Sequence, residues 1–394
     1  MVDWFHIGTT KTHLRTLAPA HPGGHLSGVT SPRSVVEAIQ LRRWALQALS
    51  TPPTPPPPAS NAGWALFLGR EACAARLLPK TPSPAPDPIR RQAEVELQRI
   101  LLLRLELAAV LEVATGLGLK PVILKGGAAL HNPDLAVPAR DLDLLLPHDE
   151  ARALLAGMER AGWVPQGRGP SHHFADRVRP GGIPVEVHPA QEGSDFGLEP
   201  AVVERAVPHP AFPSARLLAP ADQVRHLAYH QTIQHTSHRG RLRDLLLLAD
   251  ALRSMPAPPE PHRWGVSSAE LEPLTTTLTL ADRIARAIPG DDPTEETAAL
   301  WYLLDAETTH APRTAIGRLA ARWTFDLAAG EASTARRWRL MSEDQFDTRS
   351  SLLVRSARLL VFPLVLLIAT RRLSRLRSAA AHARAADQGI QRGQ

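Results

Sequence analysis

The sequence predicts a mixed α/β (α+β) fold, in which a small mixed sheet is flanked by helical N- and C-terminal regions. Short apolar runs bounded by glycine and proline turns alternate with helical segments between residues 121 and 188. Long stretches of helical periodicity, interrupted by proline-rich breaks, lie on both sides of that region. The chain has 394 residues, of which 44% are hydrophobic. It is therefore long enough for roughly two or three globular domains.

Residues 1–90 are expected to form a helical and proline-rich N-terminal region. Ser31 and Pro32 match an N-cap followed by proline at the first helical position, which predicts a helix to about Leu49. The run Thr51–Pro58 (TPPTPPPP) predicts a stiff extended linker. A second proline-rich break, at residues 81–88, ends the region.

A long helix is expected next, from Ile89 to about Thr115, ended by Gly116 and Gly118. Apolar residues occur nearly all round this segment, so the sequence predicts a buried packing helix.

The predicted core spans residues 91–190 together with this leading helix. It comprises a strand at 121–124, a helix at 126–132, a strand at 141–146, a helix at 149–161 and a hairpin at 172–188. The hairpin turn is predicted at Pro180-Gly181-Gly182.

Two helical regions are expected after the core: a helical domain at 191–345, including a helix over 220–252, and a C-terminal helix with a basic tail at 346–394. The most apolar stretch, 359–369, is too short to span a bilayer and contains Pro363. A buried terminal helix is the favoured interpretation, and any membrane contact would be peripheral, through this C-terminal segment.

Composition narrows the function classes. The formal net charge is +6, but aromatic residues make up only 5% of the chain and no arginine cluster is interleaved with them, which argues against nucleic acid as a partner. The single cysteine, Cys73, excludes a disulfide framework. With no secretory signal pattern at the N-terminus, we expect a cytoplasmic protein. The sequence does not predict the oligomeric state.

Two aspartates on one predicted strand are the strongest functional signal. Asp141 and Asp143 are two residues apart, so they project from the same face, while Leu142 and Leu144 enter the core. Glu186 lies between two valines on a later strand, an awkward place for a charge unless it faces a ligand. Carboxylates grouped in this way are suited to Mg²⁺ bound together with substrate phosphates. Without a cation, the three carboxylates are expected to raise one another's pKa.

The combination "LKGGAAL…RDLDLLL…GW…VEVH" resembles the nucleotidyltransferase superfamily of the DNA polymerase β type, and within it a largely uncharacterised bacterial nucleotidyltransferase-like family. The resemblance covers roughly residues 95–250. It implies transfer of a nucleoside monophosphate from an NTP to an acceptor hydroxyl, with two Mg²⁺ ions held by Asp141, Asp143 and Glu186. The acceptor, whether small molecule, peptide, sugar or protein, is not specified.

The resemblance also assigns substrate contacts. Gly126 and Gly127 would form a turn at a helix N-terminus where a triphosphate approaches the backbone, with Lys125 and Arg140 as charge partners for phosphates or for the carboxylates. The acceptor would be contacted by histidines near the core. The candidates are His173 and His188 in the predicted hairpin and His230 in the following helix.

Two other functions remain open. The chain could be a catalytically silent NTP-binding or partner-docking protein that keeps the fold without the chemistry. It could also be an RNA-acting module of the toxin–antitoxin type, suggested by a short Arg225-x₄-His230 match. No P-loop, dinucleotide-binding or nucleophile-elbow motif is present in the sequence, which weakens the ATPase, dehydrogenase and hydrolase readings.

Overall fold

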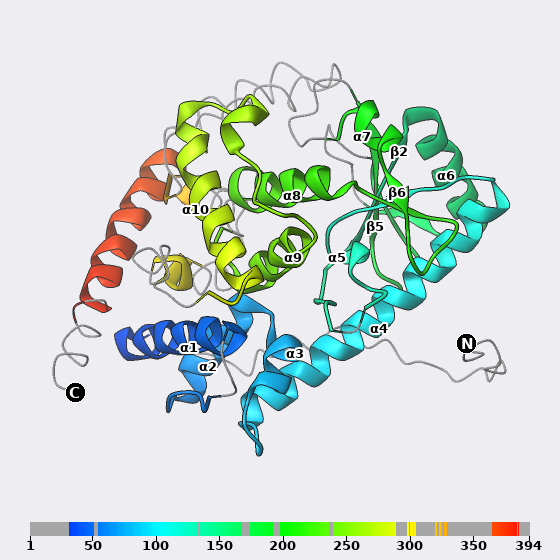
Figure 1. The fold of residues 1–394 in the computed structure, drawn as a ribbon. Coiled ribbons are helices and arrows are strands. Elements are labelled where there is room, and N and C mark those ends of the chain that lie inside the picture. The colour runs from blue at the N-terminus through cyan, green and yellow to red at the C-terminus, as the bar shows by residue number, and fades with distance from the viewer. Residues whose placement is uncertain are drawn as a thin grey trace.

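A computed structural model describes most of the predicted core and much of its flanks (Figure 1). The described residues are 31–50, 54–132, 134–166, 174–191, 198–235, 239–288, 298, 300–304, 320, 323–324, 327–328, 365–383 and 385. They form a mixed α/β structure, in which helical regions precede and follow the sheet-forming segments along the sequence. The predicted fold class is therefore confirmed.

A seven-stranded mixed sheet lies at the centre of the predicted core, in the order β3-β4-β5-β2-β1-β7-β6. The strands are β1 (Val122–Ile123), β2 (Leu142–Pro147), β3 (Val164–Gln166), β4 (Asp176–Val178), β5 (Val185–Ala190), β6 (Val207–Pro208) and β7 (Arg216–Leu217). The two longest strands, β2 and β5, are parallel neighbours, whereas β1 pairs antiparallel with β2.

Helices cover both faces of this sheet (Figure 1). On one face, α4 (Asp87–Gly116) and α6 (His148–Arg160) pack on alternate residues of β2 and β5, namely Leu142, Leu144, Leu146, Val185 and Val187. On the other face, Leu145 of β2 joins a smaller cluster with α7 (Pro200–Glu204). The strand alternation expected from the sequence is therefore present, with Leu142 and Leu144 in the core.

The long helix α4 differs from its prediction. It spans nearly the expected residues, and its inward face is buried. Its outward face is not buried, because Leu97, Leu101, Leu102 and Leu105 are each between 44% and 57% exposed. A helix that lies along one edge of the structure can bury only one side, so the apolar pattern all round it did not indicate burial all round it (Figure 1).

The remaining helices form a second core beside the sheet. It combines α1 (Pro32–Ser50), α2 (Asn61–Glu71) and α3 (Ala74–Leu77) with the later helices α8 (Pro220–Tyr229), α9 (Leu242–Leu252) and α10 (Ser268–Ala285). The 3₁₀ turns η1 (Leu78–Lys80) and η4 (Pro261–Trp264) connect them. A buried ion pair crosses this core: Arg42 Nη1 lies 2.9 Å from Glu71 Oε1, and Glu71 also accepts hydrogen bonds from Tyr302 Oη and the Leu242 amide.

One predicted helix is divided, and part of another lies outside the described residues. The segment predicted as one helix over 220–252 is α8, then the π-helical turn η2 (His230–Gln234), then α9 after Gly240, which has φ +70°. Residues 365–383 are helical and bury Val365 and Ala369, while the first part of the 359–369 stretch lies outside the described residues. None of the helices in the described part of the chain combines the length and apolarity needed to span a bilayer.

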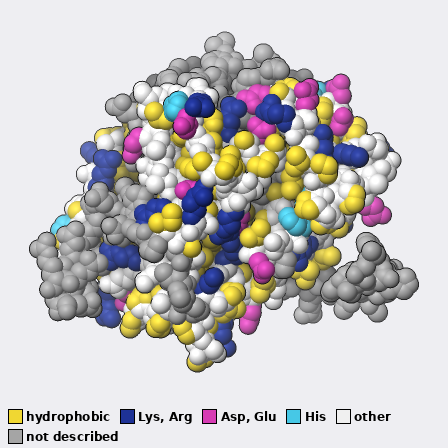
Figure 2. Space-filling model, viewed as in Figure 1, with side chains coloured by type: hydrophobic (Ala, Val, Ile, Leu, Met, Phe, Trp, Pro, Cys, Tyr) yellow, Lys and Arg dark blue, Asp and Glu magenta, His cyan; other side chains and the backbone are white. Residues whose placement is uncertain are grey.

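The surface seen in Figure 2 carries basic, acidic and hydrophobic side chains interspersed.

Candidate functional site

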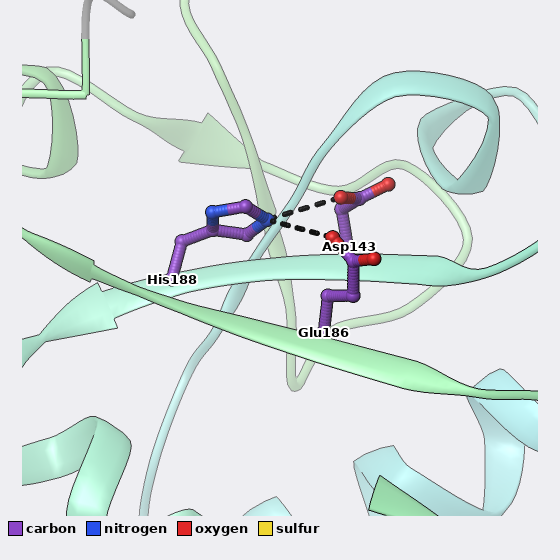
Figure 3. Close-up of side chains that lie close together, drawn as sticks. All are labelled: Asp143, Glu186 and His188. Atoms are coloured by element: carbon purple, nitrogen blue, oxygen red, sulfur yellow. Dashed lines mark hydrogen bonds and ion pairs between the residues drawn. The ribbon is translucent and has the colours of Figure 1, made fainter. Parts of the chain in front are cut away.

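The parallel strands β2 and β5 bring two of the predicted carboxylates together. Asp143 is the register partner of Glu186, and His188 follows two residues later on the same face of β5 (Figure 3). His188 Nε2 lies 3.0 Å from Asp143 Oδ1 and 3.6 Å from Glu186 Oε2. One ligand atom from each residue lies within 4.8 Å of the others, so these three side chains form a group that could hold a metal ion.

Lys125 supplies a positive charge to this group. Its Nζ lies 2.6 Å from Asp143 Oδ1, and Asp143 is buried. Burial opposes the charge on Asp143, but Lys125 and His188 outweigh it and hold the pKa of that carboxyl well below its usual range. The same contacts also affect the two cations. Burial opposes the charged forms of Lys125 and His188, yet the nearby carboxylates raise the pKa of both side chains.

Asp141 differs from Asp143. Asp141 directly precedes β2. Among the described residues, the group that could hold a metal ion consists of Asp143, Glu186 and His188 and does not include Asp141. Burial, followed by the charges of Asp143 and Glu186, raises the pKa of Asp141 to about 7. The expectation that the carboxylates raise one another's pKa therefore holds for Asp141. It is wrong for Asp143, because Lys125 and His188 stabilise the charged form of the Asp143 carboxyl.

The donor set fits a divalent cation. Carboxylate oxygens are the ligands preferred by Mg²⁺ and Mn²⁺, and an imidazole nitrogen is acceptable to Mn²⁺ and to softer ions. A further carboxyl, Asp141, is close enough for its pKa to respond to Asp143 and Glu186. A cation placed among these groups would relieve that repulsion.

The glycine turn departs from its prediction. The helix α5 covers only Lys125–Ala128, four residues, and the chain continues to Asn132 in turns rather than as the helix expected over 126–132. A Cβ on Gly127 would lie 2.8 Å from Ile123 Cγ2, so packing against β1 requires glycine there. The residue in the left-handed region is Lys125, with φ +49°, an uncommon conformation for a side-chain-bearing residue.

Two distant arginines hold the loop that leads into Asp141. Arg99 of α4 donates from Nε to the Ala139 carbonyl at 2.9 Å and from Nη2 to the Arg140 carbonyl. Arg243 of α9 donates to the Pro138 carbonyl at 3.4 Å and is itself paired with Asp244. Arg140 is exposed.

A buried carboxylate fixes the turn before β5. Glu106 of α4 accepts hydrogen bonds from Trp163 Nε1 at 2.7 Å and from Arg179 Nε at 2.9 Å. The Arg179 guanidinium also lies 4.9 Å from the centroid of the Trp163 ring. A Cβ on Gly182 would lie 2.9 Å from Glu106 Oε2, so the predicted glycine turn packs directly on this carboxylate. The turn then leads the chain into the strand that carries Glu186.

The predicted acceptor histidines fall in three different settings. His173 lies outside the described residues. His188 lies beside the carboxylates, in contact with Asp143. His230 begins the η2 turn, with ring centroids 6.0 Å from His226 and 4.5 Å from His235. Their roles with an acceptor stay predictions.

Sequence reasoning missed the supporting contacts that Arg99, Arg243 and Glu106 make. No local motif marks these contacts, because each joins segments that are distant in the sequence. It did anticipate that Lys125 would pair with phosphates or carboxylates, and the contact with Asp143 is of that kind.

The chain matches the family described as uncharacterised nucleotidyltransferases over residues 62–262, just over half of its length. The chain belongs to this family. No curated protein and no solved structure matches it. The family match starts earlier than the resemblance expected from the motifs, so it includes α2 and α3 as well as the sheet and extends through α9. Membership indicates nucleotidyl transfer in general terms, with an NTP as substrate.

Proposed function

We propose that this chain transfers a nucleoside monophosphate from an NTP to the hydroxyl of an acceptor, in the manner of the DNA polymerase β-type superfamily. The observation that carries the proposal is the pairing of Asp143 with Glu186 across two parallel strands, next to Lys125 on the glycine turn. Asp141, Asp143 and Glu186 would hold Mg²⁺. When bound, Mg²⁺ would neutralise phosphate charge and lower the pKa of the attacking hydroxyl.

In the proposed reaction the acceptor oxygen bonds to the α-phosphorus and the bond to pyrophosphate breaks. The hydroxyl proton passes to a nearby base, for which Glu186 is the candidate. Lys125 stabilises the Asp143 carboxylate and is also positioned at the turn where phosphates would bind, so its ammonium would contact the triphosphate. Arg140, exposed and directly before Asp141, is a second candidate for phosphate contact. The acceptor side is assigned to His188, His173 and His230.

The test combines binding with turnover. The full chain is incubated with Mg²⁺ and each of ATP, CTP, GTP and UTP, labelled at the α-phosphate, with and without a small-molecule and protein extract as the acceptor source. We expect label in a new product and an equal amount of pyrophosphate with one NTP. Glu186→Gln should keep the Mg²⁺-dependent thermal shift with NTP and lose transfer. Asp141, Asp143 and the nucleotide contacts remain, whereas the metal that activates the hydroxyl loses a ligand and the candidate base is removed. Equal transfer by Glu186→Gln would refute this role.

A second candidate is an NTP-binding protein that carries out no transfer. It is favoured by the ion pair of Lys125 with Asp143 at 2.6 Å, since a bound lysine competes with a metal for the same carboxylate oxygen. This candidate predicts an NTP-dependent thermal shift that does not require Mg²⁺, with no pyrophosphate and no labelled product from any of the four nucleotides.

The RNA-acting interpretation has less support. Arg225, half of the short match, lies 3.5 Å from Glu199, and His230 contacts the rings of His226 and His235. This interpretation would be supported by an RNA affinity that falls steeply with salt concentration and is lost in the Arg225→Ala variant.

A further inference from the structure

The loop between the glycine turn and Asp141 connects the two cores of the molecule. Residues 134–140, which we call the junction loop, contain no helix or strand. Two adjacent side chains of this loop are buried, and they belong to different cores. Ala136 packs in the core that α4 and α6 form with the sheet, whereas Val137 packs in the second core, which is built from helices. A shift of the junction loop would therefore disturb the packing of both cores.

The junction loop also lies against the glycine turn. A Cβ on Gly126 would lie 3.2 Å from Ala139 Cβ and 3.9 Å from Val137 Cγ2, so side chains of the loop are in contact with the turn. Asp141 directly follows the last residue of the loop. The position of the junction loop thus sets how the glycine turn and Asp141 lie relative to each other.

Arginines from three helices hold the backbone of the junction loop. Carbonyl groups in a segment without regular structure need donors from elsewhere, and a guanidinium makes stronger hydrogen bonds than a neutral donor does. Four carbonyls of the loop have such a donor. Arg76 of α3 donates to Leu135 at 3.0 Å, Arg243 of α9 donates to Pro138 at 3.4 Å, and Arg99 of α4 donates to Ala139 at 2.9 Å and also to Arg140.

Carboxylates of α9 fix two of these arginines in turn. Arg76 Nη1 lies 2.9 Å from Asp250 Oδ2, and Arg243 Nη2 lies 2.9 Å from Asp244 Oδ1. All four side chains are at most 15% exposed, so these ion pairs are only weakly screened by water. Arg76 and Arg243 therefore present fixed N–H groups to the junction loop from the second core.

We propose that Arg76 and Arg243 are positioning residues for nucleotide binding. They hold the junction loop, and with it the glycine turn and Asp141, in the arrangement that accepts Mg²⁺ and the triphosphate together. The second core is in this way part of the nucleotide-binding unit, which agrees with a family match that includes α3 and α9. The inference rests on the proposed function, because it concerns the same site.

The other part of the site does not depend on the junction loop. Asp143, Glu186 and His188 are brought together by the parallel pairing of β2 with β5. A divalent cation alone would still bind to these three side chains when the loop is displaced, whereas a triphosphate also needs the glycine turn. Loss of Arg76 or Arg243 should therefore weaken binding of Mg²⁺ with NTP much more than binding of a cation alone. General loss of structure would weaken both.

Isothermal titration calorimetry of the full chain tests this difference. The probes are Mn²⁺ alone and, in the presence of Mg²⁺, whichever of ATP, CTP, GTP and UTP the parent binds most tightly. In Arg76→Ala and in Arg243→Ala, we expect the Kd for NTP to rise about tenfold or more, because the turn is no longer held ready for the phosphates. The Kd for Mn²⁺ should stay within about threefold of the parent.

The matched control is Arg253→Ala. Arg253 pairs with the same Asp250 as Arg76 does, and it donates to the Ala285 carbonyl. Among the described residues it makes no hydrogen bond to the junction loop. This variant should bind both probes as the parent does.

Amide hydrogen exchange without ligand measures the loop itself. Residues 125–128 and 134–142 should exchange faster in Arg76→Ala and Arg243→Ala than in Arg253→Ala. Where circular dichroism shows that an alanine variant does not fold, the glutamine variant takes its place with the same expectation, because it keeps more of the aliphatic stem.

The inference is overturned if the parent binds Mg²⁺ with NTP and the Arg76 and Arg243 variants bind it as tightly as Arg253→Ala does. It is also overturned if binding of Mn²⁺ weakens as much as binding of NTP, or if exchange of the junction loop is unchanged. A parent that binds no NTP refutes the proposed function itself, and the variants play no part in that result.

Discussion

The two aspartates of the motif are expected to change stability in opposite directions when each is replaced by asparagine. Asp143 accepts the Lys125 ammonium at 2.6 Å and the His188 ring at 3.0 Å, inside the protein. Asp143→Asn leaves a buried ammonium without its carboxylate. Breaking a buried ion pair in this way costs about 3–5 kcal/mol of unfolding free energy.

Asp141→Asn removes an unfavourable charge instead. The pKa of Asp141 rises from an ordinary 3.8 to about 7 in the folded protein. At about 1.4 kcal/mol per pKa unit, the ionised carboxylate destabilises the fold by up to about 4 kcal/mol. Asparagine has a similar shape and no charge, so this variant should melt several degrees higher than the parent above pH 7, in the absence of added metal.

The pH dependence separates the two effects. An acid with a raised folded-state pKa costs nothing below pH 4, and its cost grows as the pH rises to about 7. The advantage of Asp141→Asn should therefore appear between pH 4 and 7. The pKa of Asp143 is lowered, so its stabilising contribution is present above its ordinary 3.8 and is lost as the pH falls further. The deficit of Asp143→Asn should shrink only in strong acid.

Thermal melts of the three proteins from pH 4 to 8, with and without Mg²⁺ and NTP, give the result. Bound Mg²⁺ and NTP should remove the advantage of Asp141→Asn, because a cation relieves the repulsion that the substitution relieves. The reasoning is refuted by an Asp141→Asn protein that is less stable than the parent at pH 8. It is equally refuted by an Asp143→Asn protein that melts at or above the parent temperature.

Three further predictions follow from single contacts. Gly127→Ala should lower the unfolding free energy by about 1–3 kcal/mol in denaturant titrations, because its methyl group would meet Ile123 at 2.8 Å. Glu106→Ala should cost about 2 kcal/mol and change the fluorescence of Trp163, whose indole N–H it accepts at 2.7 Å. Lys125→Met should weaken Mg²⁺-dependent NTP binding in calorimetry while leaving binding of Mn²⁺ alone equal or tighter. An unchanged NTP affinity would remove Lys125 from the phosphate site.

Much of the site could be predicted because its signals are local. The alternation Asp141-Leu142-Asp143-Leu144 decides which residues enter the core, and Leu142 and Leu144 are buried as expected. Glu186 between two valines could be identified by the same rule. The family match over residues 62–262 agrees with the motif-based resemblance to an uncharacterised nucleotidyltransferase family.

The rest depended on contacts between distant segments. That Asp143 and Glu186 are register partners follows from β2 and β5 being parallel neighbours, which no short motif specifies. The difference between the two aspartates depends on Lys125, eighteen residues before Asp143 and brought to it by the turn after β1. The prediction for α4 did not separate its two faces. The composition of a helix shows how apolar it is, but it does not show which side of the helix packs against another element.

The Lys125–Asp143 contact explains how the chain folds with three carboxylates so close together. Burying such charges without compensation is costly, and the pKa of Asp141 records what remains of that cost. Lys125 compensates for one of them, and the left-handed backbone that delivers it is stored strain of about 1–3 kcal/mol. Under the proposed function, a divalent cation would take the place of this lysine at the carboxylates, and the turn would bind phosphates. The site would then have two arrangements: in one, Lys125 pairs with Asp143; in the other, the metal would pair with the carboxylates and Lys125 with phosphate. Metal and nucleotide would then each favour the other's binding, because either alone must displace part of an existing pair.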